Sequence, residues 1–117
     1  MNRKTKAGND WTFIPYNELK GRKDDAGKLD WTLIPFKELE GTVKVLQFGA
    51  EKYGRENWKS VPDGLFRYRK ALMRHVVEYI NNPTVLDESG ESHLSHIICN
   101  ALFLLHLEGK DENEARS

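Results

Sequence analysis

Three histidines and a glutamate stand at helical spacing in the second half of the chain. His75 and Glu78 are three positions apart, and so are His93 and His96. Residues with this spacing lie on one face of an α-helix, so each pair can point toward one site. Imidazole and carboxylate groups transfer protons when their surroundings bring their pKa near the working pH. We therefore interpret these four residues as candidate catalytic groups.

The same side chains could bind a divalent metal. His93 and His96 would supply nitrogen ligands. Oxygen ligands could come from Glu78, Asp87 or Glu88. A set rich in imidazole favours Zn, Mn, Ni or Fe over Mg. The alternative to a metal site fits the sequence equally well. In it, one of the two histidines forms hydrogen bonds with buried polar groups, and the other is solvated.

Positive charge precedes the first histidine on the same predicted helix. Arg67 and Arg74 share a helical stripe with His75. Guanidinium groups bind phosphate through paired, charge-assisted hydrogen bonds. The alternative is a basic helix face that is simply solvated. On the later helix, Asn100 continues the stripe of the two histidines.

Three predicted helices position these residues. Apolar residues recur every three or four positions over 36–53, 65–81 and about 89–108, which is the pattern of a helix with one buried face. The short connection between the second and third helices favours antiparallel neighbours. We therefore expect an all-α fold, with three main helices in an antiparallel bundle. Because three helices of this length make a thin core, we expect dimerisation to complete it.

A twelve-residue segment is duplicated near the N-terminus, at 10–21 and 30–41. In each copy an apolar stretch meets a proline, which disfavours helix before it and suits a first helical turn after it. We expect the copy at Pro35 to begin a helix and the copy at Pro15 to form an extended arm. The predicted organisation is an arm over 1–29, a helical domain over 30–109 and a polar tail over 110–117.

Composition excludes several classes of partner and location. Eighteen basic and eighteen acidic residues give a formal net charge of +0, so nothing global attracts the chain to duplex nucleic acid or anionic lipid. No apolar run approaches the roughly 20 residues of a membrane helix, and no signal peptide is recognisable. We expect a cytoplasmic protein. The lone Cys99 is interpreted as a buried structural thiol.

Five ordered motifs span most of the chain between Gly21 and Glu108. They are Lys23-x-Asp25-x-Gly27-Lys28, Trp31-x-Leu33-Ile34-Pro35, Val45-Leu46-x-Phe48-Gly49-Ala50-x-Lys52-Tyr53-Gly54-x-x-Asn57-Trp58, Arg67-x-x-x-Ala71-Leu72-x-Arg74-His75 and Asp87-x-Ser89-Gly90-x-x-His93-Leu94-x-His96. Together they resemble the N-terminal domain of phage dATP/dGTP diphosphohydrolases. That family is distantly similar to the all-α, MazG-like nucleoside triphosphate pyrophosphohydrolases, which bind Mg²⁺ through ExxE on one helix and ExxD on a later one.

The carboxylates of that Mg²⁺ motif are largely replaced in this chain. The corresponding spacings read His75-x-x-Glu78 and His93-x-x-His96. Exchanging hard carboxylates for imidazole weakens a Mg²⁺ site and favours direct binding of phosphate. A divalent metal, with Mg, Mn or Zn as candidates, is thus an expectation that the resemblance supports only in part.

The resemblance implies that 30–109 is a nucleotide-binding domain that hydrolyses a purine (deoxy)nucleoside triphosphate to monophosphate and diphosphate. In that case Lys52, Arg67 and Arg74 would bind the phosphates, and the base would stack on an aromatic side chain. The candidates for contact with the nucleotide are Lys52, Tyr53, Trp58, Arg67, Tyr68, Arg74 and Asn100.

Two alternatives use the same sequence differently. One is a non-catalytic protein that sequesters a nucleotide signal of bacterial defence against phage, with the same basic and aromatic residues. The other is a structural or protein-binding module that docks through the duplicated segment. In each case we expect a homo-oligomer in the cytoplasm of an infected bacterium.

Overall fold

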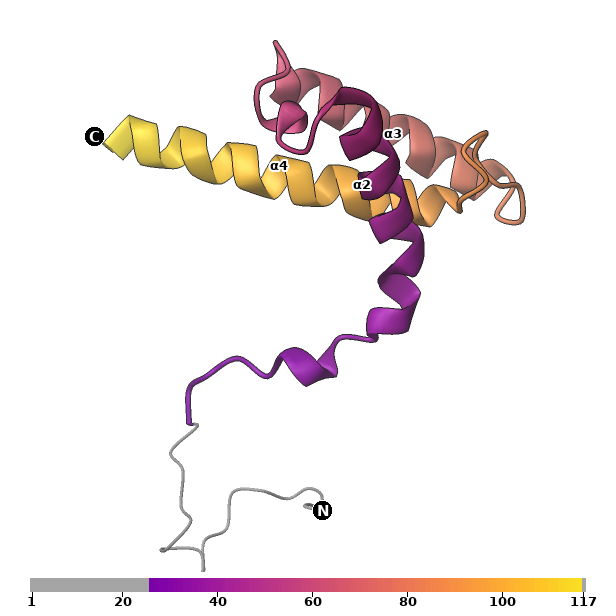
Figure 1. Ribbon diagram of the computed structural model, residues 1–117, viewed down its shortest axis with the longest axis horizontal. Helices are drawn as coiled ribbons and strands as arrows, with labels where there is room; N and C mark the ends of the chain where they lie inside the picture. The colour runs from indigo at the N-terminus through magenta and orange to yellow at the C-terminus, as the bar shows by residue number, and fades with distance from the viewer. Residues whose placement is uncertain (1–25, 117) are drawn as a thin grey trace, which may run out of the picture. The chain divides into compact units, whose positions relative to one another are not determined.

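The computed structural model describes residues 26–116, and the side chains of 26–110. The chain divides between Leu33 and Ile34 into two units, and the second contains every α-helix of the described range. No strand forms within that range; an isolated bridge joins Leu86 to Ser92. The helices are η1 (Trp31–Leu33), η2 (Phe36–Leu39), α2 (Glu40–Tyr53), η3 (Asn57–Lys59), α3 (Gly64–Asn81) and α4 (His93–Arg116) (Figure 1). The predicted all-α class with three main helices is confirmed.

Helices α3 and α4 lie side by side and run in opposite directions (Figure 1). Near the start of α3 the ring of Tyr68 lies 4.9 Å from that of Phe103, between centroids. Two turns later His75 lies 4.5 Å from His96. Because residue numbers fall along α4 as they rise along α3, the two helices are antiparallel, as predicted.

Helix α2 crosses the first turns of α4 (Figure 1). The hydroxyl of Thr42, a buried side chain, donates a hydrogen bond to the carbonyl of Ser95 at 3.1 Å. Gly41 lies so close to α4 that a methyl group in its place would overlap the hydroxyl of Ser95. The absence of a side chain at Gly41 therefore sets how closely α2 approaches α4.

The loop between α2 and α3 is held by aromatic packing. Trp58 of η3 stacks on Phe103 of α4, with centroids 4.4 Å apart and planes 15° apart. The hydroxyl of Tyr68 donates to the main-chain carbonyl of Trp58 at 2.9 Å. These contacts hold the loop against the pair formed by α3 and α4.

Two helix ends differ from the sequence-based expectation. Helix α4 begins at His93 because the Ser92 hydroxyl accepts the N–H of Leu94 at 3.0 Å and so caps the helix. The predicted end near Glu108 is wrong, since the helix continues to Arg116. Thus the segment predicted as a polar tail is helical as far as Arg116. A single Gly109 costs only about 1 kcal/mol in a helix, and no proline follows to stop it.

The second copy of the duplicated segment enters η2 and α2. Pro35 precedes η2, which continues directly into α2, so the expected helix start is present with a first turn of the 3-10 type. The first copy, at 10–21, and the arm predicted for 1–29 lie outside the described residues except for 26–29. None of the described helices is long and apolar enough to cross a membrane.

Few apolar side chains in the described range are fully buried. Cys99 and Leu104, both on α4, are buried. Exposed apolar side chains on α3 include Phe66, Met73 and Ile80. The expectation that a second copy completes the bundle therefore stays a prediction.

Candidate active site

Two buried histidines meet where the second half of α3 faces the first turn of α4. His75 and His93 are each 3% exposed. Their Nδ1 atoms lie 2.8 Å apart. Because an imidazole nitrogen can either donate or accept, one of these two nitrogens carries a proton and the other does not.

The neighbours of the histidine pair decide which nitrogen carries the proton. Arg74 places Nη2 3.4 Å from Nε2 of His75, and a guanidinium can only donate. His75 therefore accepts at Nε2 and donates from Nδ1 to His93. That leaves Nε2 of His93 protonated, and it lies 3.2 Å from Oε1 of Glu78. The result is a directional chain of hydrogen bonds from Arg74 to Glu78, whose side chain is 47% exposed.

The loop between α3 and α4 adds a carboxylate to the site. Asp87 places Oδ2 3.3 Å from Nε2 of His96 and Oδ1 4.0 Å from Nδ1 of His75. The rings of His75 and His96 stack with planes 8° apart. Ser89 holds the loop, because its N–H donates to Asp87 at 2.9 Å and its hydroxyl lies 2.8 Å from His96.

Burial lowers the pKa of His75, and the positive charges of His96 and Arg74 lower it further. Burial also lowers the pKa of His96, against the opposing effect of Asp87. For Asp87, burial raises the pKa, but hydrogen bonds from Ser89 and the nearby imidazoles outweigh this and bring it below its usual value. Neutral imidazole beside an ionised carboxylate is the state that accepts protons or binds metal.

Four of these residues offer atoms that a metal could bind. His75, Glu78, Asp87 and His93 each present one donor atom, and the four lie within 4.8 Å of one another. Two nitrogen and two oxygen donors suit Zn or Mn better than Mg, which prefers oxygen alone.

The metal set predicted from the sequence is only partly brought together. Of the predicted ligands, Glu78 and His93 belong to the four-donor group. His75 supplies its second nitrogen. His96 contacts Asp87 and Ser89 instead. Glu88 is exposed and outside the group, whereas its neighbour Asp87 is inside it.

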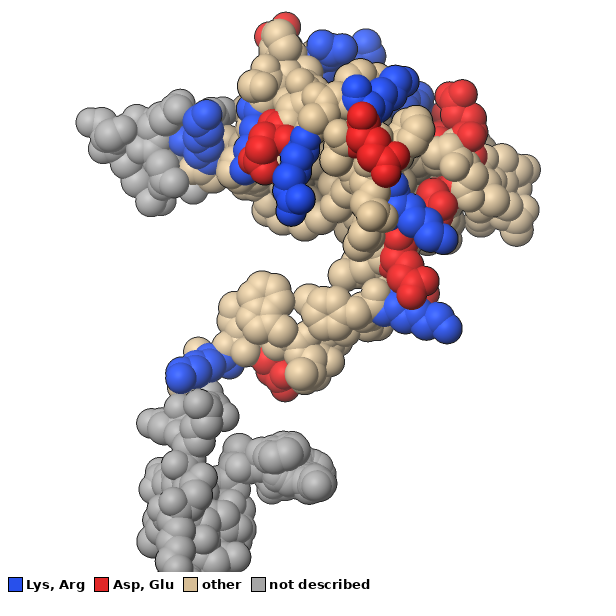
Figure 2. All heavy atoms as spheres, viewed as in Figure 1, with Lys and Arg blue, Asp and Glu red and all other residues tan. Residues whose placement is uncertain are grey.

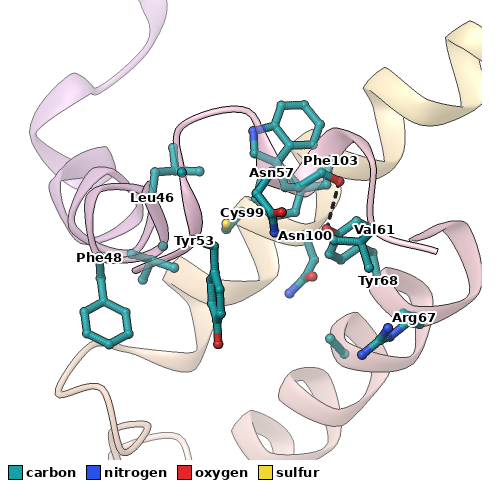
Figure 3. Close-up of a pocket in the computed structure, with 15 residues that line it drawn as sticks. Leu46, Phe48, Tyr53, Asn57, Val61, Arg67, Tyr68, Cys99, Asn100 and Phe103 are labelled. Atoms are coloured by element: carbon teal, nitrogen blue, oxygen red, sulfur yellow. Dashed lines mark hydrogen bonds between the residues drawn. The ribbon is translucent and has the colours of Figure 1, made fainter. Parts of the chain in front are cut away.

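A pocket of about 600 Å³ lies beside the cluster, between α2, α3, α4 and the loop after α2 (Figure 3). Ala71 lines it one helical turn before His75, and Asn100 lines it one turn after His96, a rise of about 6 Å in each case. Of the predicted nucleotide contacts, those that line the pocket are Tyr53, Trp58, Arg67, Tyr68 and Asn100.

The other two predicted phosphate ligands lie outside this pocket. Lys52 places Nζ 5.2 Å from the ring centroid of Tyr53. Arg74 lies at the histidine cluster. One face of Trp58 is covered by Phe103, so this ring anchors the loop, whereas the ring of Tyr53 is exposed apart from its contact with Lys52.

Charge in the pocket favours an anionic ligand. Arg67 is the one charged residue among those that line it in the described part of the chain. Elsewhere, basic and acidic side chains are interspersed over the face in Figure 2.

Sequence reasoning missed the structural role of Ser89 and the place of Asn57 in the pocket. Ser89 stands two residues after Asp87, a spacing typical of a turn in which a carboxylate accepts a main-chain N–H. That spacing could have identified Ser89. Asn57 lies in a loop whose path the sequence does not specify.

Comparison with known proteins identifies a family to which the chain is similar. Residues 18–117 match the family described as "dATP/dGTP diphosphohydrolase, N-terminal". A dATP/dGTP diphosphohydrolase of Salmonella phage PMBT28 is 34% identical to this chain over 89 residues, which are 76% of the chain and 30% of that relative. The chain thus spans under a third of the length of this relative. No solved structure shows significant similarity.

Proposed function

The chain belongs to the dATP/dGTP diphosphohydrolase N-terminal family, and from this we propose that it binds a purine deoxynucleoside triphosphate and hydrolyses it to monophosphate and diphosphate. The observation that carries the proposal is the position of the four-donor group, one helical turn from an aromatic pocket with a single positive charge. A nucleotide has a flat base and an anionic tail, which match these two adjacent regions.

In this proposal the base enters the pocket and the phosphates point toward the cluster. Tyr53 offers an exposed ring for stacking. Arg67 lies at the pocket and Arg74 at the histidine cluster. They are seven residues, or about 10 Å, apart along α3. Both residues are exposed, and a guanidinium can donate to phosphate oxygens.

Glu78 is the residue we propose as general base. It terminates the hydrogen-bond chain and is half exposed, whereas both buried histidines are committed to hydrogen bonds. Its carboxylate would take a proton from the water that attacks phosphorus, and the bond from that phosphorus to the leaving diphosphate oxygen would break. His93 orients the carboxylate through its Nε2–H, and His75 fixes the tautomer of His93 as long as no metal occupies their two Nδ1 atoms.

A divalent cation is the proposed cofactor, and it would be held by His75, Glu78, Asp87 and His93. Glu78 would bind it through one carboxylate oxygen and keep the other to accept the proton. When bound, it would supply positive charge to the triphosphate and acidify water. The mixed donor set supports Mn or Zn over Mg. We also propose that the protein acts in the cytoplasm of an infected bacterium, as the phage origin of the relative suggests.

The proposal is tested by incubating the purified chain with dATP, dGTP, dCTP and dTTP in Mg²⁺, Mn²⁺, Zn²⁺ or Co²⁺ and separating the products by chromatography. We expect monophosphate and diphosphate from the purine nucleotides. His75→Gln should abolish the products, while His106→Gln, a matched change outside the cluster, should not. Absence of hydrolysis with every metal would contradict the proposal.

Sequestration without hydrolysis is the second candidate, because both histidines of the buried pair are engaged in hydrogen bonds. It predicts a nucleotide that co-purifies or binds tightly and is recovered unchanged after heat denaturation. Mass analysis of the released ligand distinguishes the two candidates.

A further inference from the structure

One amide in the pocket has a fixed orientation, and its oxygen accepts no hydrogen bond from the described residues. Asn100 is 7% exposed, and its Nδ2 donates to the carbonyl of His96 at 2.9 Å. A carbonyl only accepts, so the amide nitrogen must face His96, and the oxygen must face the other way. No described residue donates a hydrogen bond to Oδ1 of Asn100.

A buried carbonyl oxygen without a hydrogen-bond donor is destabilising, because it has lost its bonds to water. Oδ1 of Asn100 therefore favours a ligand that brings a hydrogen-bond donor into the pocket. Figure 3 shows Asn100 among the lining side chains, with Asn57 and Tyr53 also labelled around the same space.

The other polar groups of the pocket do not replace this acceptor. The hydroxyl of Tyr68 already donates to the carbonyl of Trp58. Arg67 can only donate. Asn57 is exposed at the loop, where water competes for its amide. Asn100 is thus the buried acceptor with which the pocket can distinguish ligands.

We propose that Oδ1 of Asn100 accepts a hydrogen bond from the amino group of a purine base, which makes Asn100 a specificity-determining residue. This rests on the proposed function in taking the ligand to be a purine nucleotide, but not on its hydrolysis. Guanine and adenine each carry one exocyclic amino group, whereas hypoxanthine and unsubstituted purine carry none. A site built to bind such a donor rejects the analogue without it far more strongly than an apolar pocket does.

The test measures binding of deoxynucleoside monophosphates by calorimetry, since these are not substrates for release of diphosphate. Two pairs differ by one amino group each: dGMP against dIMP, and dAMP against the monophosphate of purine deoxyriboside. We expect the amino-bearing member to bind at least about tenfold more tightly in at least one pair. Asn100→Leu should remove this discrimination, while Asn81→Leu, an exposed asparagine outside the pocket, should preserve it.

The outcomes separate this inference from the proposed function. Equal binding within both pairs by the unaltered protein overturns the inference, whether or not Asn100→Leu folds. Discrimination that persists in a folded Asn100→Leu variant also overturns it. If discrimination depends on Asn100 but no triphosphate is hydrolysed, the inference stands and the hydrolase proposal fails.

Discussion

His75 and His93 join α3 to α4 through their two Nδ1 atoms, which lie 2.8 Å apart in a buried position. This contact requires one proton between the two nitrogens. A metal that uses both Nδ1 atoms would displace that proton, because a metal-bound imidazole nitrogen must be deprotonated. The hydrogen-bond chain and a metal bound in this way are therefore alternative states of the same residues.

Glu78→Gln tests whether Glu78, at the exposed end of the hydrogen-bond chain, acts as a general base. Glutamine keeps the size and still accepts from His93, but it cannot take a proton from water at neutral pH. We expect hydrolysis to fall by about 10²–10⁴-fold, with nucleotide affinity changed much less. Glu88→Gln is the matched control, since Glu88 is exposed and outside the cluster. Equal activity of the two variants would refute the assignment.

Metal binding should stabilise the protein. At one hundred times its dissociation constant a ligand adds about 2.7 kcal/mol to the free energy of unfolding, so Zn²⁺ or Mn²⁺ should raise Tm after treatment with chelator. Mg²⁺ at the same concentration should raise it less. Thermal unfolding followed by circular dichroism measures Tm with and without each metal. A His93→Ala variant with an unchanged response to Zn²⁺ would argue against this site.

The fold was largely predictable because it depends on local periodicity. Apolar residues at intervals of three and four located all three helices, and the short connection before His93 predicted antiparallel neighbours. The end of α4 was not predictable in the same way, because Gly109 is a weak stop when strong helix formers follow it. Contacts with no local pattern, such as that of Gly41 with Ser95, also required the structure.

The candidate site was predictable as a location but not as a network. Helical spacing placed His75, Glu78 and His93 near one another, and the structure adds their hydrogen-bond order. The choice of Asp87 over Glu88 depends on the path of an irregular loop, in which adjacent residues point in different directions. Spacing alone could not show that Asn100 leaves an oxygen free, since that follows from its bond to His96.

Two glycines of α2 should respond oppositely to alanine. At Gly41 the added methyl meets Ser95 and comes within 3.3 Å of Glu91, so Gly41→Ala should lower the free energy of unfolding by about 1–3 kcal/mol. At Gly49 nothing lies within 4 Å, so Gly49→Ala should raise it by about 0.5–1 kcal/mol through helix propensity. Urea denaturation measures both. Similar effects at the two positions would mean that α2 does not pack closely on α4 in solution.

Cys99 should be nearly inert to thiol reagents in the folded protein. It is 5% exposed, and burial raises the pKa of its thiol to about 11. Only the thiolate reacts, so at pH 8 the reactive fraction is on the order of one in a thousand, against roughly one in four for a free cysteine of pKa about 8.5.

The rate of labelling by a chromogenic disulfide, measured with and without denaturant, checks this expectation. We expect fast labelling in denaturant and labelling slower by at least about two orders of magnitude in the folded state. Raising the pH from 8 toward 10 should speed the folded-state reaction in proportion to thiolate. Because Cys99 lines the pocket, a bound purine nucleotide should slow it further. Rapid labelling of the folded chain at pH 8 would show that α4 is not packed as described.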